Sequence, residues 1–115
     1  MSHKRYYGQS LSTLGQVAVA LKLPDAAVQH FREAYETFQA LVKFDPSNAR
    51  WEIDLGRACL DLSEGLSDPQ AAITDEVKRL VEEGSAIVRK RSEMLGNEGQ
   101  EMLRRFDSIV HPLSP

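Results

Sequence analysis

The chain lacks the features that would place it in a membrane, outside the cell or on nucleic acid. No apolar run approaches the roughly 18 residues that span a bilayer, and the first residues contain no apolar stretch typical of a secretory signal. The single cysteine, Cys59, excludes a disulfide within the chain and fits a reducing compartment. Positive charge is not in excess, since the net charge is −3 and the pI about 5.6. We therefore expect a cytoplasmic protein that binds neither membranes nor nucleic acid.

Glycine and proline are also scarce, with 7 and 5 of 115 residues, which argues against a disordered chain. Hydrophobic residues make up 42%, enough for one domain with a real core. Turn-forming clusters at 23–25, 44–48, 67–69 and 95–99 divide the sequence into segments of helical period. This pattern predicts an all-α antiparallel array of about five helices. The cluster residues that could cap helices are Ser47 or Asn48, and Ser67 or Asp68.

The first segment shows how the core stripe of a helix is predicted. Its large apolar residues recur at helical spacing, together with one alanine: Tyr7, Leu11, Leu14, Ala18 and Leu21. Such a stripe is expected to be buried against a neighbouring helix. The next segment repeats the pattern, with small side chains at Ala27 and Ala34 and an aromatic ring at Phe31.

These residues, read as Leu11-x2-Leu14-Gly15-x2-Ala18 and then Ala27-x3-Phe31-x2-Ala34, resemble the tetratricopeptide repeat (TPR). In that interpretation Gly15, Ala27 and Ala34 let two helices approach closely, and Phe31 fills the gap between them. The segment from Asp45 to Leu55 resembles the D-P-x-N-x-x-W-x-x-D-L junction of a long-repeat bacterial variety.

The resemblance implies helix hairpins stacked in a right-handed superhelix, within one domain over residues 1–110. The first repeat would span about 9–44, a degenerate second repeat 47–95 and a capping helix 99–110, with a tail at 111–115. TPR domains bind peptides or proteins in the groove lined by the first helix of each repeat. The residues that would line this groove are Gln9, Ser12, Gln16, Val19, Asp54, Arg57, Asp61 and Glu64.

The second repeat can be aligned with the repeat pattern in two registers, set by Leu55 or by Ala72, that differ by three residues. Arg57 and Glu64 face the groove in both. The groove is polar and slightly acidic, which favours a protein or peptide partner of basic or mixed charge. A ligand held by its terminal carboxylate is not expected, because Ser12 and Gln16 stand where the chaperone-binding TPR domains place their clamp residues. The expected function is therefore protein binding without catalysis and without a cofactor.

Two alternatives remain open at this point. The first is a helical dimerisation or assembly domain without a peptide groove, with the segment 73–95 as its seam. The second is a small metal-dependent enzyme that uses His30 with Asp25 and Glu33. The histidines are too scattered for a known metal motif, and Cys59 lies on an apolar stripe where a thiol is inert. We therefore expect neither a catalytic site nor a metal site.

Two repeats and a cap are few for a repeat array, which usually needs about three repeats for stability. Either the chain belongs to a longer array or a second copy covers its exposed edge. The residues predicted to form that edge, on the first helix, are Tyr6, Tyr7, Val17 and Val19. Self-association or docking of another chain through this helix is therefore also expected.

Overall fold

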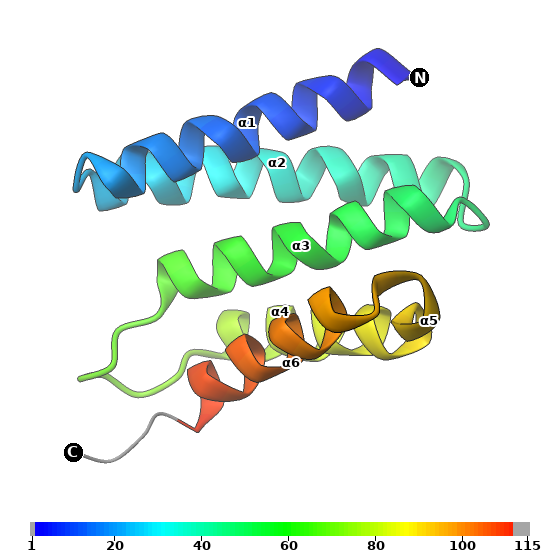
Figure 1. Ribbon diagram of the computed structural model, residues 1–115. Coiled ribbons are helices and arrows are strands. Elements are labelled where there is room, and N and C mark those ends of the chain that lie inside the picture. Colours follow the sequence, from blue (N-terminus) through cyan, green and yellow to red (C-terminus); the bar gives the residue numbers. More distant parts are fainter. Residues whose placement is uncertain (1, 112–115) are drawn as a thin grey trace.

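A computed structural model describes residues 2–111, and these residues form helices and connecting turns with no strand among them (Figure 1). This confirms the predicted all-α class. The helices are α1 (Ser2–Ala20), α2 (Pro24–Phe44), α3 (Ala49–Leu66), α4 (Asp75–Lys90), α5 (Ser92–Leu95) and α6 (Asn97–Val110). About five helices were expected, and α5 is a single additional turn between α4 and α6. The tail lies outside the described residues, apart from His111.

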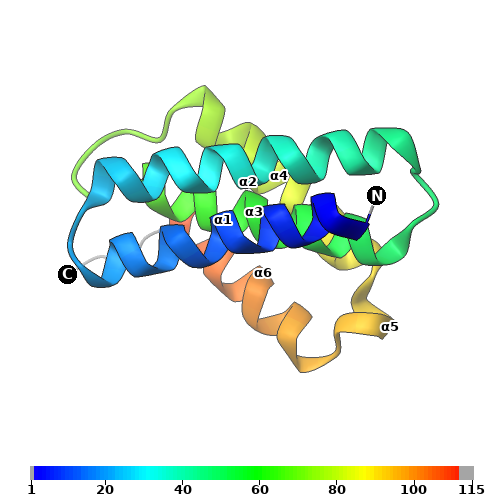
Figure 2. The ribbon, with the colours of Figure 1, turned by 90° about the horizontal axis from the view of Figure 1, so that it is seen from above.

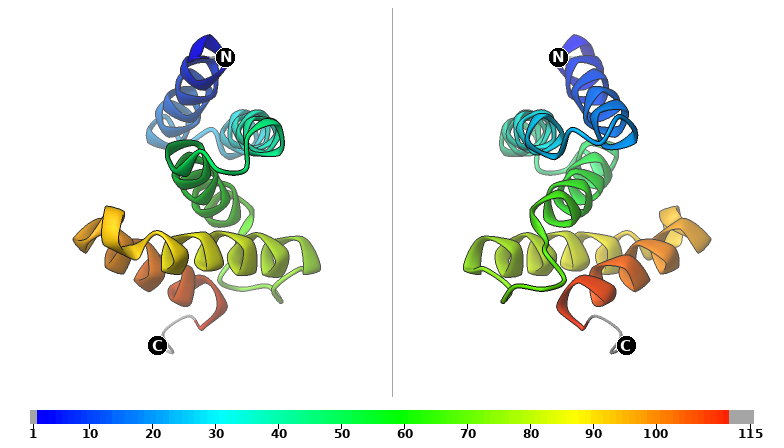
Figure 3. Two further views of the ribbon diagram at one scale, coloured as in Figure 1. Left: turned by 90° about the vertical axis from the view of Figure 1, so that its right-hand side faces the viewer. Right: turned by 90° about the vertical axis from the view of Figure 1, so that its left-hand side faces the viewer.

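Each of the first three helices runs antiparallel to the next, so that α1 and α3 point the same way, and α4 with α6 forms a lower layer beneath α3 (Figures 1 and 3). Seen from above, α2 and the beginning of α4 lie on one side of α3, whereas α6 lies on the other side (Figure 2). The first helix therefore forms one end of the array. The helix α3 lies in the middle, where α1, α2, α4 and α6 all contact it.

Glycines in α1 determine how closely α1 and α2 approach. A Cβ atom added at Gly15 would overlap the ring of Phe31, and one at Gly8 would lie 2.6 Å from Cζ of Phe38. Ala27 and Ala34 of α2 are buried. The predicted close approach is confirmed at Gly15 and Phe31: the two rings fill space that only glycine leaves free.

The predicted core stripe of the first helix is partly wrong. Tyr7, Leu14 and Leu21 are 56%, 48% and 65% exposed, although Leu11 and Ala18 are buried as expected. The reason is the close glycine contact with α2. It centres the buried face on the small residues and turns the large ones toward solvent. The residues of the predicted edge, Tyr6, Tyr7, Val17 and Val19, are exposed.

The start of α3 follows the predicted junction. The side chain of Asn48 caps the helix by accepting a hydrogen bond from the Trp51 backbone N–H at 3.1 Å. Within the preceding turn, the Asp45 carboxylate accepts hydrogen bonds from the backbone N–H and the hydroxyl of Ser47. Asn48, rather than Ser47, is thus the cap.

The predicted cap at Ser67 or Asp68 is wrong. The chain is not helical from 67 to 74, and α4 begins only at Asp75, with the Thr74 hydroxyl accepting from the Val77 N–H at 3.2 Å. Asp68 instead closes a turn by accepting from the Gln70 N–H at 2.9 Å. Thr74 is followed by two acidic residues in the first turn of α4, where the helix dipole favours them, and this explains the later start.

The lower layer packs around a glycine of its own. A Cβ atom at Gly84 of α4 would overlap the Phe106 ring of α6 and lie 2.8 Å from Cβ of Cys59 in α3. Phe106 is 1% exposed and is one of the largest fully buried side chains. Gly84 therefore lets α3, α4 and α6 meet around one aromatic ring.

Candidate functional site

The predicted groove residues of α3 lie between α1 and α6, and most of them are engaged with these two helices. Asp54 is only 4% exposed, so its predicted place on the open face is wrong. Its carboxylate accepts from Nε of Arg5 in α1 at 2.7 Å and from Nη1 of Arg57 at 3.4 Å. A buried carboxylate is stable when it is paired in this way, so Asp54 holds α1 to α3 and is not available to a ligand.

Arg57 and Glu64 face α6 and remain partly open to solvent. The guanidinium of Arg57 donates two hydrogen bonds to Glu98, at 2.9 Å from Nε and 2.7 Å from Nη2. Two turns further along both helices, Arg105 of α6 pairs with Glu64 of α3, so that here the cation lies on α6 and the carboxylate on α3. The side chains of Arg57 and Glu64 are 43% and 36% exposed, so both are reachable from solvent.

Asp61 lies between these two ion pairs. Its Oδ1 accepts a hydrogen bond from Nε2 of Gln16 in α1 at 3.2 Å. Burial raises the pKa of Asp61 to about 6, although the nearby cation of Arg105 opposes this shift. The structure thus brings Gln16, Asp61 and Arg105 together from three different helices.

The remaining predicted residues of α1 are less involved. Gln9 and Ser12 are half-buried, and Val19 is 52% exposed. None of these three lines the cavities described next, nor do Gln16 and Asp54. Of the predicted α1 residues, only Gln16 therefore reaches the surface between α3 and α6, through its hydrogen bond to Asp61.

Two hollows lie along the contact of α3 with α6, on either side of Arg105, which lines both. The smaller, of about 210 Å³, contains the predicted residues Arg57 and Asp61. The larger, of about 430 Å³, contains Glu64. We call the two hollows with the Arg57–Glu98 and Glu64–Arg105 pairs the α3–α6 groove.

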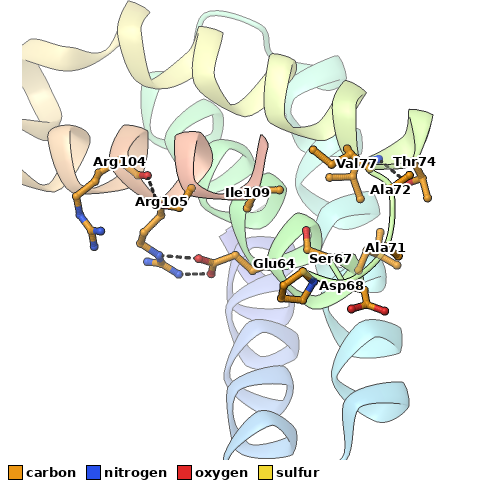
Figure 4. A pocket seen from close by; sticks show the side chains of 14 residues that line it. Glu64, Ser67, Asp68, Ala71, Ala72, Thr74, Val77, Arg104, Arg105 and Ile109 are labelled. Atoms are coloured by element: carbon orange, nitrogen blue, oxygen red, sulfur yellow. Dashed lines mark hydrogen bonds and ion pairs between the residues drawn. The ribbon is translucent and has the colours of Figure 1, made fainter. Parts of the chain in front are cut away.

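The larger hollow is bounded by the end of α3, the turn 67–74, the start of α4 and the end of α6. Figure 4 shows the Glu64–Arg105 pair at one side of it and Thr74 with Ala72 at the other. Its apolar lining is formed by Leu66, Pro69, Ala71, Ala72, Ile73, Val77 and Ile109. Sequence reasoning missed this hollow because it took 67–69 as the direct start of a helix. The signal that could have found it is Thr74 followed by Asp75 and Glu76, a cap and an acidic first turn that place the helix start after 67–74.

Comparison with protein-family models, with curated proteins and with solved structures finds no match. The side chains of the groove and the hollows therefore carry any functional conclusion.

Other chemistry has less support in the described residues. Within 2–111, no three His, Cys, Asp or Glu side chains are grouped so as to hold a metal ion. Nδ1 of His30 is buried without a hydrogen-bond partner. None of the helices described is both long and apolar enough to cross a bilayer.

Proposed function

We propose that this chain is a TPR-like interaction module that binds an extended peptide segment of a partner protein in the α3–α6 groove, without catalysis. Two observations support the TPR-like interpretation. The residues that carry the resemblance, Gly15 and Phe31 in particular, make the close helix contact expected of them. In addition, Asn48 caps α3 at the expected junction.

The larger hollow is the observation that carries the proposal. Its volume of about 430 Å³ lies within the range of roughly 300–1,000 Å³ typical of ligand sites. An apolar side chain of a peptide would enter it and contact Val77 and Ile109, which both line it. Polar groups at its border, Glu64 and Asp68 on one hand and Arg104 on the other, would orient the flanking residues of the peptide.

The charges of the groove indicate a peptide of mixed charge. Each exposed cation of the groove already has a carboxylate beside it, and each pair is partly open to solvent. A basic residue of the peptide could pair with the carboxylate of such a pair, and an acidic residue of the peptide with its cation. No buried charge would then be left unpaired. Complementarity of this kind determines specificity and encounter rate more than affinity.

A cytoplasmic location is part of the same proposal. It is supported by the cysteine content: the chain has a single cysteine, Cys59, which cannot form an internal disulfide and is fully buried.

The experiment is selection from a random peptide display library on the whole chain, followed by fluorescence polarisation with a selected peptide. Ala72→Trp fills the hollow, and we expect it to weaken binding at least tenfold. Ala86→Trp is the matched control, because Ala86 is exposed on α4 outside both hollows. The double variant Arg57→Glu/Glu64→Arg should weaken binding as well.

The proposal would be wrong if no peptide were enriched over the library background. It would also be wrong if Ala72→Trp and Ala86→Trp affected a selected peptide equally. Circular dichroism of each variant separates a loss of binding from a loss of fold.

A further inference from the structure

Asp61 differs from the other acids of the smaller hollow, because within residues 2–111 no cation is bonded to its carboxylate. The other two acids that line this hollow are paired, Glu98 with Arg57 and Glu101 with Arg104. The Asp61 side chain is half-buried at the border of the hollow. A carboxylate in such a place is most stable when a cation or several hydrogen bonds neutralise it.

The two cations that line the same hollow are bonded to other acids. Arg57 donates two hydrogen bonds to Glu98, and Arg105 pairs with Glu64 (Figure 4). Both guanidiniums are near enough to act on Asp61 through their charge, but neither donates a hydrogen bond to it among the described contacts. The carboxylate of Asp61 therefore still lacks a bonded counter-ion.

The contact that α1 makes with Asp61 is uncharged. Nε2 of Gln16 donates to Oδ1 at 3.2 Å, and Oδ2 accepts no hydrogen bond from the described side chains. Burial raises the pKa of Asp61 to about 6; the charge of Arg105 opposes this rise, and that of Glu64 adds to it. A cation bonded to Oδ2 would favour the ionised carboxylate.

We propose that the smaller hollow binds a lysine or arginine side chain of the peptide, with Asp61 as its counter-ion. This inference rests on the proposed function, because the cation belongs to the peptide that occupies the α3–α6 groove. The apolar residues Leu60 and Met102 line the same hollow and suit the methylene stem of such a side chain. One negative charge is in excess among the charged residues that line the hollow, which are Arg57, Asp61, Glu98, Glu101 and Arg105.

The two hollows also predict a spacing within the peptide. Asp61 lines the smaller hollow and Ser67 the larger, six residues later on α3, which is about 9 Å along the helix. An extended chain advances about 3.3 Å per residue. We therefore expect the basic residue about three positions from the apolar residue that enters the larger hollow.

The test compares a selected basic peptide with a neutral copy, in which norleucine replaces lysine or citrulline replaces arginine. In fluorescence polarisation at pH 7.5, the neutral copy should bind the wild type about tenfold more weakly. Asp61→Asn should bind both peptides alike, at the affinity that the wild type has for the neutral copy. Asp107→Asn is the matched control, since Asp107 is exposed on α6 and lines neither hollow.

The pH dependence of binding gives a second readout. Only the ionised carboxylate of Asp61 forms the ion pair, so the affinity for the basic peptide should fall about tenfold between pH 7.5 and pH 5. Lysine and arginine stay charged over this range. The extra fall should therefore be missing for the neutral copy and for Asp61→Asn.

Three results would overturn the inference. If the neutral copy bound as tightly as the basic peptide, or if no selected peptide carried a basic residue, the groove would have no cation site. If the basic peptide kept its advantage in Asp61→Asn, another acid would hold the cation. In each of these cases a loss of binding in Ala72→Trp would still support the proposed function.

If the library yields no peptide, the cation site is tested alone. The probe is N-acetyl-lysine methylamide at millimolar concentration, with N-acetyl-norleucine methylamide as the neutral control. Because Gln16 is bonded to Asp61, the NMR signal of its side-chain amide should shift with the lysine probe in the wild type and not in Asp61→Asn. That shift would preserve the cation site although the peptide function had failed, and an unchanged signal would overturn the cation site as well.

Discussion

Arg57 of α3 donates two hydrogen bonds to one carboxylate, that of Glu98 in the first turn of α6. The contact joins residues 41 positions apart and attaches the last helix to the centre of the array. The pair forms one edge of the α3–α6 groove.

The pair makes a pH-dependent contribution to stability that can be measured. The Arg57 hydrogen bonds lower the pKa of Glu98 from its ordinary value of 4.5, so the contribution is present above that pH and is lost as the pH falls below it. Both side chains are more than a third exposed, which limits the contribution to about 1 kcal/mol or less. We expect Glu98→Gln to lower the free energy of unfolding by that amount at pH 7 and to have no effect near pH 3.

Urea titration followed by circular dichroism measures the free energy of unfolding at pH 7 and near pH 3. Glu93→Gln removes the same charge from an exposed position on α5 and serves as the control. If Glu98→Gln and Glu93→Gln lowered the free energy of unfolding equally at pH 7, the effect would come from the change in net charge and not from the Arg57–Glu98 pair.

Asp61 should show the opposite pH dependence. Burial raises its pKa from 3.8 to about 6, so the folded state holds the proton more tightly than the unfolded state between these two values. Stability from this group therefore falls as the pH rises from 4 to above 6. Asp61→Asn keeps an oxygen for Gln16 and removes the charge. We expect the variant to match the wild type near pH 4 and to be more stable by about 3 kcal/mol at pH 8. A difference that stays constant over this pH range would contradict the assignment.

The first helix, α1, shows which features of the fold the sequence predicts and which it does not. The small residues Gly15, Ala27 and Ala34 predicted a close contact between α1 and α2, because they leave room for a neighbouring helix at short distance. Treating every large apolar residue as core was wrong for Leu14. Hydrophobic spacing gives the period of a helix, but the neighbour decides which side is buried. Here the neighbour's rings, Phe31 and Phe38, select the glycine side.

The candidate site could be predicted only in part for a similar reason. The polar spacing along α3 placed Arg57, Asp61 and Glu64 on one face, and the structure has them there. Their partners, Glu98 and Arg105, are more than 40 residues away, so local pattern cannot reveal the pairs. The hollow beside Ile109 depends on where three chain segments meet, which only the fold determines.

Gly84 should tolerate no larger side chain. In Gly84→Ala the new methyl group would meet the Phe106 ring and Cβ of Cys59, a cost of roughly 1–3 kcal/mol. The higher helix propensity of alanine offsets up to about 1 kcal/mol of this cost, so a net loss of stability is expected. Gly65→Ala is the control, since its methyl group would be 3.4 Å from Val28, an ordinary contact. Thermal unfolding of both variants should show a lower midpoint only for Gly84→Ala. Equal midpoints would show that α4 can move away from α6 at little cost.

Cys59 should be inert while the protein is folded. Its side chain is fully buried, and its Sγ lies 3.6 Å from Oε1 of Glu83. Burial raises the pKa of the thiol, and the nearby carboxylate raises it further, so the reactive thiolate is disfavoured. A thiol reagent at pH 8 should label the native chain only through unfolding and should label one site per chain in urea.

Two variants show which cause dominates. Ala86→Cys places an exposed thiol on α4, and it should react quickly in the folded protein while Cys59 does not. Glu83→Gln removes the carboxylate but leaves the thiol buried. Because burial is the larger cause of the raised pKa, the Glu83→Gln chain should still react slowly. Rapid labelling of Cys59 in the folded Glu83→Gln protein would show instead that the carboxylate protects the thiol. If Cys59 of the folded wild type reacted as fast as the exposed thiol of Ala86→Cys, α3 and α4 would have to separate readily at this point.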